Sequence, residues 1–222
     1  MPKLLPAFIA SAALAITAAL VWPGLWLPYA LLKTLTTLLV IAHAWRLGGQ
    51  GTPMRTPLLA GLVLSLVGDV ALLWPQQGFL PGLVSFLLAH LAYLRAYCSD
   101  CRQPAWLALM LALSIGASIF SLLANNGLGA LLLPVACYAL AISAMLWRAL
   151  ARLGTDVPER SALLAAAGAL AFVFSDSVIG IDRFAVPFSA APYVIIISYW
   201  LGQWGIAASA FSQSHRPERE QP

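Results

Sequence analysis

The stretch L-L-P-A-F-I-A-S-A-A-L-A-I-T-A-A-L-V, residues 4–21, decides the fold class because it contains no charged residue. A helix of roughly 20 apolar residues crosses the hydrocarbon core of a bilayer. Lys3 precedes the stretch, and a cleaved signal peptide is the alternative interpretation. We favour a retained first span, because the run is long for a signal sequence and the chain after it is equally apolar.

The composition of the whole chain extends this interpretation to all 222 residues, of which 61% are hydrophobic and 9% charged. Soluble domains contain roughly 25% charged residues. This length leaves room for about eight spans and for no sizeable soluble domain. The net charge of +4 is spread through the loops, where topology and anionic lipid heads explain it without a nucleic-acid partner.

Breaks at proline, glycine and charged residues divide the chain into eight apolar segments. They cover residues 4–21, 25–46, 57–74, 79–97, 104–123, 128–150, 161–181 and 190–211. These segments predict an all-α polytopic membrane protein with a single domain over residues 1–211. The polar tail, residues 212–222, is expected to be disordered and cytoplasmic.

Basic residues lie in alternate loops, which predicts the orientation of the chain. On one side they are Lys3, Arg46, Arg55, Arg95, Arg102, Arg148, Arg152, Arg160, Arg216 and Arg219. The loops of the other side contain only Arg183. Basic loops stay in the cytoplasm, so both termini are expected there, which requires an even number of spans. We expect the protein in the bacterial inner (cell) membrane.

Two acidic stretches resemble each other and suggest an internal repeat. L-S-L-V-G-D-V-A-L-L (64–73) and F-V-F-S-D-S-V-I-G (172–180) each place an aspartate after a small residue, near the outer end of a predicted span. The two spans run in the same direction. The first four and last four spans therefore suggest a 4+4 parallel repeat about an axis along the membrane normal.

Asp69 and Asp176 are the carboxylates of these stretches and the first candidates for a functional site. A charged residue at the bilayer centre costs roughly 2.5–3.5 kcal/mol on insertion scales, so such residues face the bundle interior and often mark function. The alternative is that each bonds to a neighbouring helix or reaches water at the outer surface. Their matched depth favours function.

Other polar residues lie near the same layer. Lys33 is about eight residues, or roughly 12 Å, into the second span, although its long side chain could instead reach the interface. His90 and Tyr93 lie one turn apart, as do Tyr199 and Gln203, so each pair can face one cavity. His90 is a candidate for proton handling, with an internally hydrogen-bonded histidine as the alternative.

The sequence does not favour a metal site or a serine nucleophile. Ser65, Ser175 and Ser177 lie within about one helical turn of the aspartates, but no G-x-S-x-G motif is present. Cys98 and Cys101 form a C-x-x-C without a second pair, and a histidine-rich zinc site would need more than the three histidines of the chain. We expect no metal and no cofactor.

The polar residues lie in motifs that resemble a known family. The motifs are Lys33, S-L-V-G-D (65–69), G-F-L-P-G-L-V-S-F-L-L-A-H-L-A-Y (78–93), F-S-D-S (174–177) and Y-W-L-G-Q (199–203). In this order, over nearly the whole chain, they resemble the YhhN family of lysoplasmalogenases. One departure is T-L-T-T after Lys33, where the family pattern has a proline. The departure leaves the placement of Lys33, and any part in holding a phosphate, open.

The resemblance implies an eight-helix membrane hydrolase that cleaves the vinyl ether bond of lysoplasmalogens. The products are a fatty aldehyde and glycerophosphoethanolamine or glycerophosphocholine. It implies that Asp69 and Asp176 are catalytic. The expected substrate-binding residues are Lys33, Ser65, His90, Tyr93, Ser175, Tyr199 and Gln203. The expected partners are the lysophospholipid and membrane lipids; the sequence sets neither head-group preference nor oligomeric state.

Vinyl ethers hydrolyse by protonation at carbon, which gives an oxocarbenium ion that water captures. Two carboxylates in different surroundings can act as an acid/base pair, in which one is the general acid and the other stabilises the cation or directs the water, as in glycosidases. We favour Asp176 as the acid, because Lys33 is expected to lie near Asp69. The alternatives are a small-solute or proton-coupled transporter that uses the same charges, and a lipid-binding scaffold without catalysis.

Overall fold

The computed structural model describes residues 4–21, 26–47 and 52–211, which form eight α-helices and no strand. The helices are α1 (Leu4–Val21), α2 (Trp26–Leu47), α3 (Arg55–Ala71), α4 (Phe79–Tyr97), α5 (Trp106–Asn125), α6 (Leu132–Leu150), α7 (Glu159–Phe184) and α8 (Ala191–Phe211), with a 3-10 turn, η1 (Gly129–Leu131), before α6. By length and composition, six are able to cross a membrane: α1, α2, α4, α5, α6 with its preceding turn, and α7. The predicted all-α polytopic membrane fold is confirmed.

The helix ends differ from the predicted spans at two places that matter for the site. α3 ends at Ala71, before the turns around Pro75, and α7 continues three residues beyond the predicted end, to Phe184. Asp176 therefore lies about 12 Å before the end of α7, at 1.5 Å of rise per residue. The tail, residues 212–222, for which we predicted disorder, lies outside the described residues.

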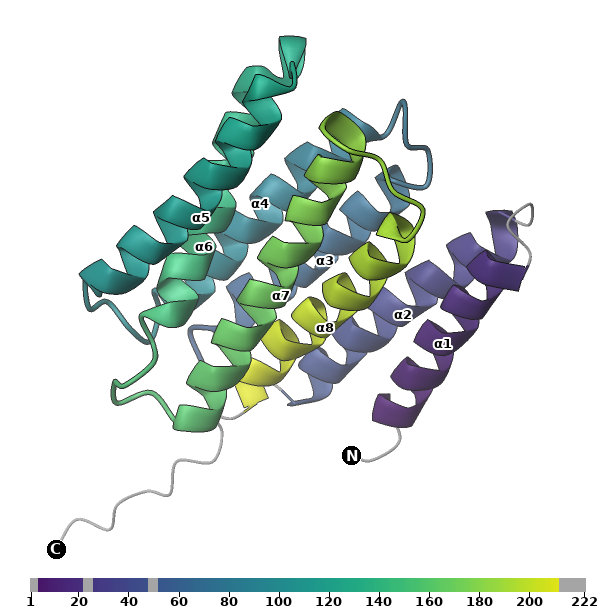
Figure 1. Ribbon diagram of the computed structural model, residues 1–222. Coiled ribbons are helices and arrows are strands. Elements are labelled where there is room, and N and C mark those ends of the chain that lie inside the picture. Colours follow the sequence, from purple (N-terminus) through teal and green to yellow (C-terminus); the bar gives the residue numbers. More distant parts are fainter. Residues whose placement is uncertain (1–3, 22–25, 48–51, 212–222) are drawn as a thin grey trace, which may run out of the picture.

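The helices form one bundle in which α1 and α5 lie at opposite edges (Figure 1). α1 begins and α8 ends on the same side of the bundle, as the even number of spans requires. The most extensive packing joins α3 to α4 and α7 to α8, and α2 packs on α8 as α6 packs on α4. If each of the first four helices is matched with the helix four places later, the α3–α4 contact corresponds to the α7–α8 contact, and the α2–α8 contact corresponds to the α6–α4 contact. This correspondence agrees with the predicted 4+4 repeat.

Glycines bring α7 and α8 unusually close together. A Cβ atom on Gly168 would lie 2.7 Å from the backbone nitrogen of Ile206, and one on Gly202 would lie 2.9 Å from that of Phe172. Small residues allow membrane helices to approach backbone to backbone. This contact fixes the position of α7, which carries Asp176, against α8, which carries Tyr199.

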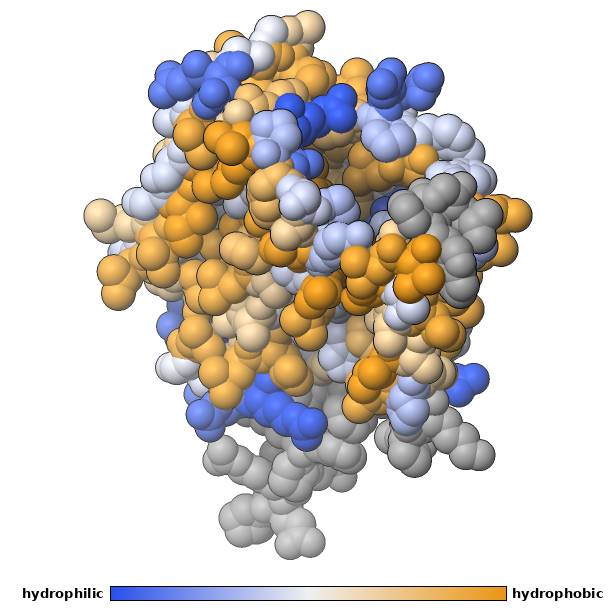
Figure 2. Space-filling model, turned by 45° about the vertical axis from the view of Figure 1, so that its right-hand side comes forward, coloured by the Kyte–Doolittle hydropathy of each residue, from blue (hydrophilic) through white to orange (hydrophobic). Residues whose placement is uncertain are grey.

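The surface is apolar around its middle and polar at its ends. Figure 2 shows hydrophobic side chains over the middle of one face, with hydrophilic side chains at both ends. Among the candidate spans, α5 exposes the most apolar surface, with Leu107 82% exposed and Met110 67% exposed. Such a surface suits a chain surrounded by lipid.

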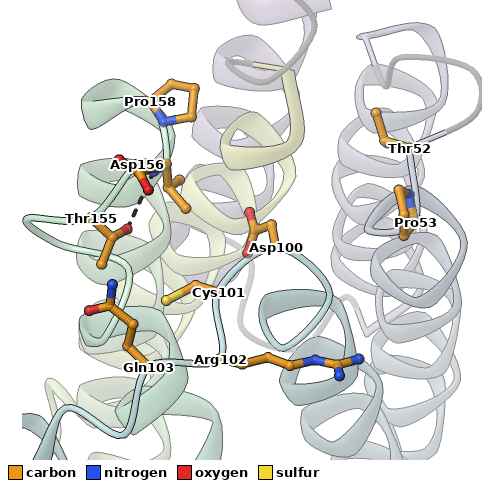
Figure 3. A pocket seen from close by; sticks show the side chains of 10 residues that line it. Thr52, Pro53, Asp100, Cys101, Arg102, Gln103, Thr155, Asp156 and Pro158 are labelled. Carbon is orange, nitrogen blue, oxygen red and sulfur yellow. Dashed lines mark hydrogen bonds between the residues drawn. The ribbon is translucent and has the colours of Figure 1, made fainter.

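The loops at the end where α8 finishes enclose a pocket of about 340 Å³ (Figure 3). Two of the arginines from which the orientation was predicted are buried near this pocket. The Arg152 guanidinium binds the Asp100 carboxylate at 2.8 Å, and Arg148 donates a hydrogen bond to the backbone oxygen of Gln103 at 2.6 Å. Cys101, which lines the pocket, is a free thiol, as is Cys98. These arginines therefore also hold loops together, and the cytoplasmic orientation stays a prediction.

Candidate active site

Asp69 lies on the buried face of α3 and has its charge matched by three neighbours. Its Oδ1 is 3.3 Å from the Lys33 ammonium nitrogen, and its Oδ2 accepts hydrogen bonds from Thr37 at 2.8 Å and Tyr199 at 2.7 Å. Lys33 and Thr37 are one turn apart on α2, and Tyr199 comes from α8. A buried carboxylate with a cation and two hydroxyl donors can remain ionised.

The Asp69 network continues through hydrogen bonds along α8 and α4. The Gln203 amide nitrogen donates to the Tyr199 hydroxyl at 3.0 Å, and its carbonyl accepts from Tyr93 at 2.9 Å. The Tyr93 hydroxyl lies 3.1 Å from the Ser65 hydroxyl. All of these residues are buried, so this network is a closed polar core that links α2, α3, α4 and α8.

Asp176 lies on α7 and forms a second, smaller network. Its Oδ2 accepts a short hydrogen bond from the Tyr138 hydroxyl of α6 and lies 3.4 Å from Nε2 of His90 on α4. That imidazole nitrogen is also 2.9 Å from the Tyr138 hydroxyl. Nδ1 of His90 is buried and has no hydrogen-bond partner in the described part of the chain. A hydroxyl between a carboxyl group and an imidazole can pass a proton between them.

Aromatic rings separate the two networks. The Phe172 ring centroid is 4.8 Å from that of His90 and 5.3 Å from that of Tyr199, both in edge contacts. Phe86 makes similar edge contacts with Phe172 and Tyr199, at 6.1 and 5.9 Å. Hence each carboxylate has its own surroundings, with an apolar wall between them.

Asp176 lines two apolar pockets, and Asp69 lines neither. The deep pocket, about 60 Å³, lies between α5, α6 and α7 and reaches Ala112 and Leu146. The outer pocket, about 70 Å³, reaches towards the end of α7 and is lined by Leu72, Phe79, Leu83, Phe86, Leu123, Val135, Tyr138, Asp176, Ile179, Gly180 and Phe184. The Asp176 side chain is 12% exposed and the Asp69 side chain 3%. A water molecule needs only about 10–15 Å³, so both pockets can admit small groups.

Comparison with known proteins gives a family that fits this site. The model of the YhhN family matches residues 29–210, which include both networks. The chain belongs to the YhhN family. No solved structure matches it significantly.

Curated relatives of this YhhN protein are named lysoplasmalogenases. The human lysoplasmalogenase TMEM86B is 38% identical over 84% of this chain and 80% of its own length. The bovine lysoplasmalogenase TMEM86A is 33% identical over 94% of this chain and 88% of its own length. A lysoplasmalogenase of Mycobacterium bovis is 34% identical over 74% of this chain and 64% of its own length.

In this YhhN protein, the site residues predicted from the sequence fall into two separate networks. Lys33, Ser65, Tyr93, Tyr199 and Gln203 join Asp69 in one network. His90 joins Asp176 instead. The sequence predicted that the two acids and Lys33 lie in one layer of the membrane, and the structure further divides them between two networks, because α3 and α7 point the two carboxylates to different neighbours.

Ser175 takes a packing position. Its hydroxyl donates to the backbone oxygen of Ile195 at 3.0 Å, across the contact between α7 and α8. Successive residues of a helix point about 100° apart, so Ser175 faces α8 while Asp176 faces α6 and α4. Its expected part in substrate binding has no support from this geometry.

Sequence reasoning missed Tyr138 and Thr37. Thr37 follows Lys33 by four residues, so it shares the face of Lys33 on the helix. Tyr138 lies within its span, whereas membrane tyrosines gather at the interfaces. A buried tyrosine hydroxyl needs a hydrogen-bond partner, and this mid-span position was the available signal.

The donor set suits proton transfer better than metal binding. Among the described residues, no group of three or more histidine, cysteine, aspartate or glutamate side chains lies close enough to hold a metal ion. Asp176 and Tyr138 instead line both apolar pockets, and the buried His90 lies behind them, 2.9 Å from the Tyr138 hydroxyl. This arrangement can deliver a proton to a poorly polar molecule.

Proposed function

We propose that this chain is a membrane-embedded lysoplasmalogenase. It cleaves the vinyl ether bond of a lysoplasmalogen to a fatty aldehyde and glycerophosphoethanolamine or glycerophosphocholine. The observation that carries the proposal is the position of Asp176, a hydrogen-bonded carboxyl group at the junction of two apolar pockets between helices. The names of the relatives support the substrate class. We place the protein in the bacterial inner membrane, with both termini cytoplasmic.

Asp176 acts as the general acid in this proposal. Its carboxyl proton moves to the vinyl carbon that does not bear oxygen, and the double-bond electrons form the new C–H bond. The carbon bonded to oxygen becomes an oxocarbenium ion, and water adds to it while the Asp176 carboxylate accepts a water proton. The hemiacetal then breaks its bond to the glycerol oxygen, which takes a proton, and the aldehyde forms.

The neighbours of Asp176 hold and move that proton. Tyr138 fixes the orientation of the carboxyl group by its hydrogen bond, and His90 exchanges a proton with the carboxyl group through Tyr138. Asp69 acts as a positioning residue in this proposal, because its oxygens are occupied by Lys33, Thr37 and Tyr199. Its negative charge still stabilises a cation formed on the far side of Phe172.

The test is aldehyde release by the purified protein in detergent from a 1-alkenyl lysophospholipid. The saturated 1-alkyl ether is the control, because it has no double bond to protonate. In D2O, the aldehyde should carry one deuterium at the carbon next to the carbonyl. Aldehyde incubated with the protein in D2O measures background exchange.

Cleavage of the saturated ether, or aldehyde without deuterium above background, would contradict protonation at carbon. Proton or solute movement across proteoliposomes, with no aldehyde released, would favour the transporter alternative. Tight lipid binding without either product would favour a scaffold.

A further inference from the structure

Arg183 lies seven residues, about two helical turns, beyond Asp176 on α7 and packs on two aromatic rings. Its guanidinium carbon is 3.9 Å from the ring centroid of Phe79 and 5.7 Å from that of Phe184. Both rings line the outer pocket. Nη1 also donates to the backbone oxygen of Pro75 at 3.3 Å. The stacking and this bond hold the cation on two rings of that pocket.

Arg183 also stands apart by its charge. It lies in the last turn of α7, and among the described residues at that end of the bundle it is the only lysine or arginine. Within the described ranges, the ion pairs are Lys33–Asp69 and Arg152–Asp100, and neither of them involves Arg183. The adjacent Asp182 accepts a hydrogen bond from the backbone nitrogen of Phe188 at 3.1 Å. The exposed guanidinium therefore faces the surface with donors available to an anion.

The spacing on α7 connects this cation to the acid. Arg183 follows Asp176 by seven residues, which is about 10 Å along the helix. Helical side chains lean towards the N-terminus, so the guanidinium reaches back towards the pocket. In a lysophospholipid, a glycerol unit separates the ether oxygen from the phosphate, and that unit fits between the carboxyl group and the cation.

We infer that Arg183 binds the phosphate of a single-chain phospholipid whose first chain carbons, next to the ether, enter the deep pocket. This inference rests on the proposed function. Arginine suits the role, because its planar fork can donate two parallel hydrogen bonds to phosphate while it stacks on an aromatic ring. Lys33, the residue first considered for the phosphate, is 3.3 Å from Asp69 within the closed network and faces no pocket that Asp176 lines.

The binding mode makes substrate selection depend on the phosphate. A 1-alkenyl lysophospholipid engages both the deep pocket and Arg183, whereas a 1-alkenylglycerol engages the deep pocket alone. Removal of the cation should therefore weaken only the phosphate-bearing ligand.

The experiment compares R183Q and R183K with wild type on these two alkenyl substrates, and measures binding of the uncleaved 1-alkyl lysophospholipid and 1-alkylglycerol. R183Q should lower kcat/KM for the phospholipid about 10- to 100-fold, mainly through KM, the size expected for a lost charged hydrogen bond. It should weaken 1-alkyl lysophospholipid binding by a similar factor. Both glycerol ligands should be unaffected, and R183K should recover part of the loss.

R102Q, at the opposite end of the bundle, is the matched control and should behave as wild type. Equal losses on both ligand classes would overturn the inference and indicate a structural role, as would no loss on either. The binding arm separates the two proposals. If wild type releases no aldehyde but R183Q still selectively loses the phosphate-bearing ether, the proposed function fails and the phosphate site stands.

Discussion

Asp69 and Asp176 occupy equivalent places in the two halves of the bundle, and their neighbours are different in kind. Each receives a contact from the helix before its own, Lys33 of α2 or Tyr138 of α6. Each also meets the last helix of the other half, through Tyr199 of α8 or His90 of α4. The same backbone arrangement therefore presents one acid to a cation and the other to proton-exchanging groups.

The difference teaches that an intramembrane carboxylate is not in itself a catalytic one. The Asp69 network is closed and uses both carboxylate oxygens, which suits a group that keeps its charge and holds helices together. The Asp176 network has few members and borders two pockets, which suits a group that loses and regains a proton. The following variants test this difference between the two aspartates.

Asp176→Asn should have the largest effect. Asparagine keeps the shape of the side chain but has no acidic proton, so kcat should fall by about 10²- to 10⁴-fold, the usual contribution of a general acid. Aldehyde release measures the loss, and the midpoint of thermal unfolding should stay near that of wild type. Asp182→Asn, on the same helix but in the lining of neither pocket, should keep its activity. Near-normal turnover by Asp176→Asn would remove the basis for distinguishing the two acids.

Asp69→Asn should act mainly on stability. It leaves the Lys33 ammonium buried without its anion, and breaking a buried ion pair costs about 3–5 kcal/mol. The midpoint of unfolding in detergent should fall clearly, and the double variant K33M/D69N should recover most of the fall. If Asp69→Asn instead unfolds like wild type while activity vanishes, Asp69 belongs to the chemistry and our division of roles is wrong.

Tyr138→Phe should have an intermediate effect on turnover. It removes one hydrogen bond to the carboxyl group, worth about 1.5–3 kcal/mol for a charged partner, or roughly 10- to 100-fold in kcat. Steady-state kinetics with a 1-alkenyl lysophospholipid check it, with Tyr193→Phe at the start of α8 as control. An unchanged kcat would show that the short bond seen here has no part in proton transfer.

Ala112→Leu should have the smallest effect, confined to KM. Ala112 lines the far end of the deep pocket, so a larger side chain there reduces the space for the chain carbons next to the ether. KM should rise severalfold while kcat stays near that of wild type, since each buried methylene contributes about 0.8 kcal/mol. Leu111→Phe, on the lipid-exposed side of α5, should change neither. An unchanged KM in Ala112→Leu would place these carbons elsewhere.

The fold could be predicted closely from the sequence. A charge or an unpaired backbone group in lipid is costly, so each span is a helix of mostly apolar residues and can be recognised from its composition. The placement of Lys33 near Asp69 also followed from the order of the spans, and the salt bridge confirms that proximity. The separation of the two networks did not follow. It depends on how far each helix is rotated and on Phe172, an ordinary apolar residue in the sequence that lies between His90 and Tyr199 in the bundle.

The position of Asp176 between two pockets has a consequence for product release. In the proposed binding mode a lysolipid is held at two points, by its first chain carbons in the deep pocket and by its phosphate on Arg183, and binding at the second point is strengthened by the connection to the first. Cleavage between them cuts that connection. The aldehyde would then keep only the deep pocket and the glycerophospho head only Arg183, so each would bind far more weakly than the substrate did. The proposed reaction thereby turns a divalent ligand into two monovalent ones, which would limit inhibition by its own products.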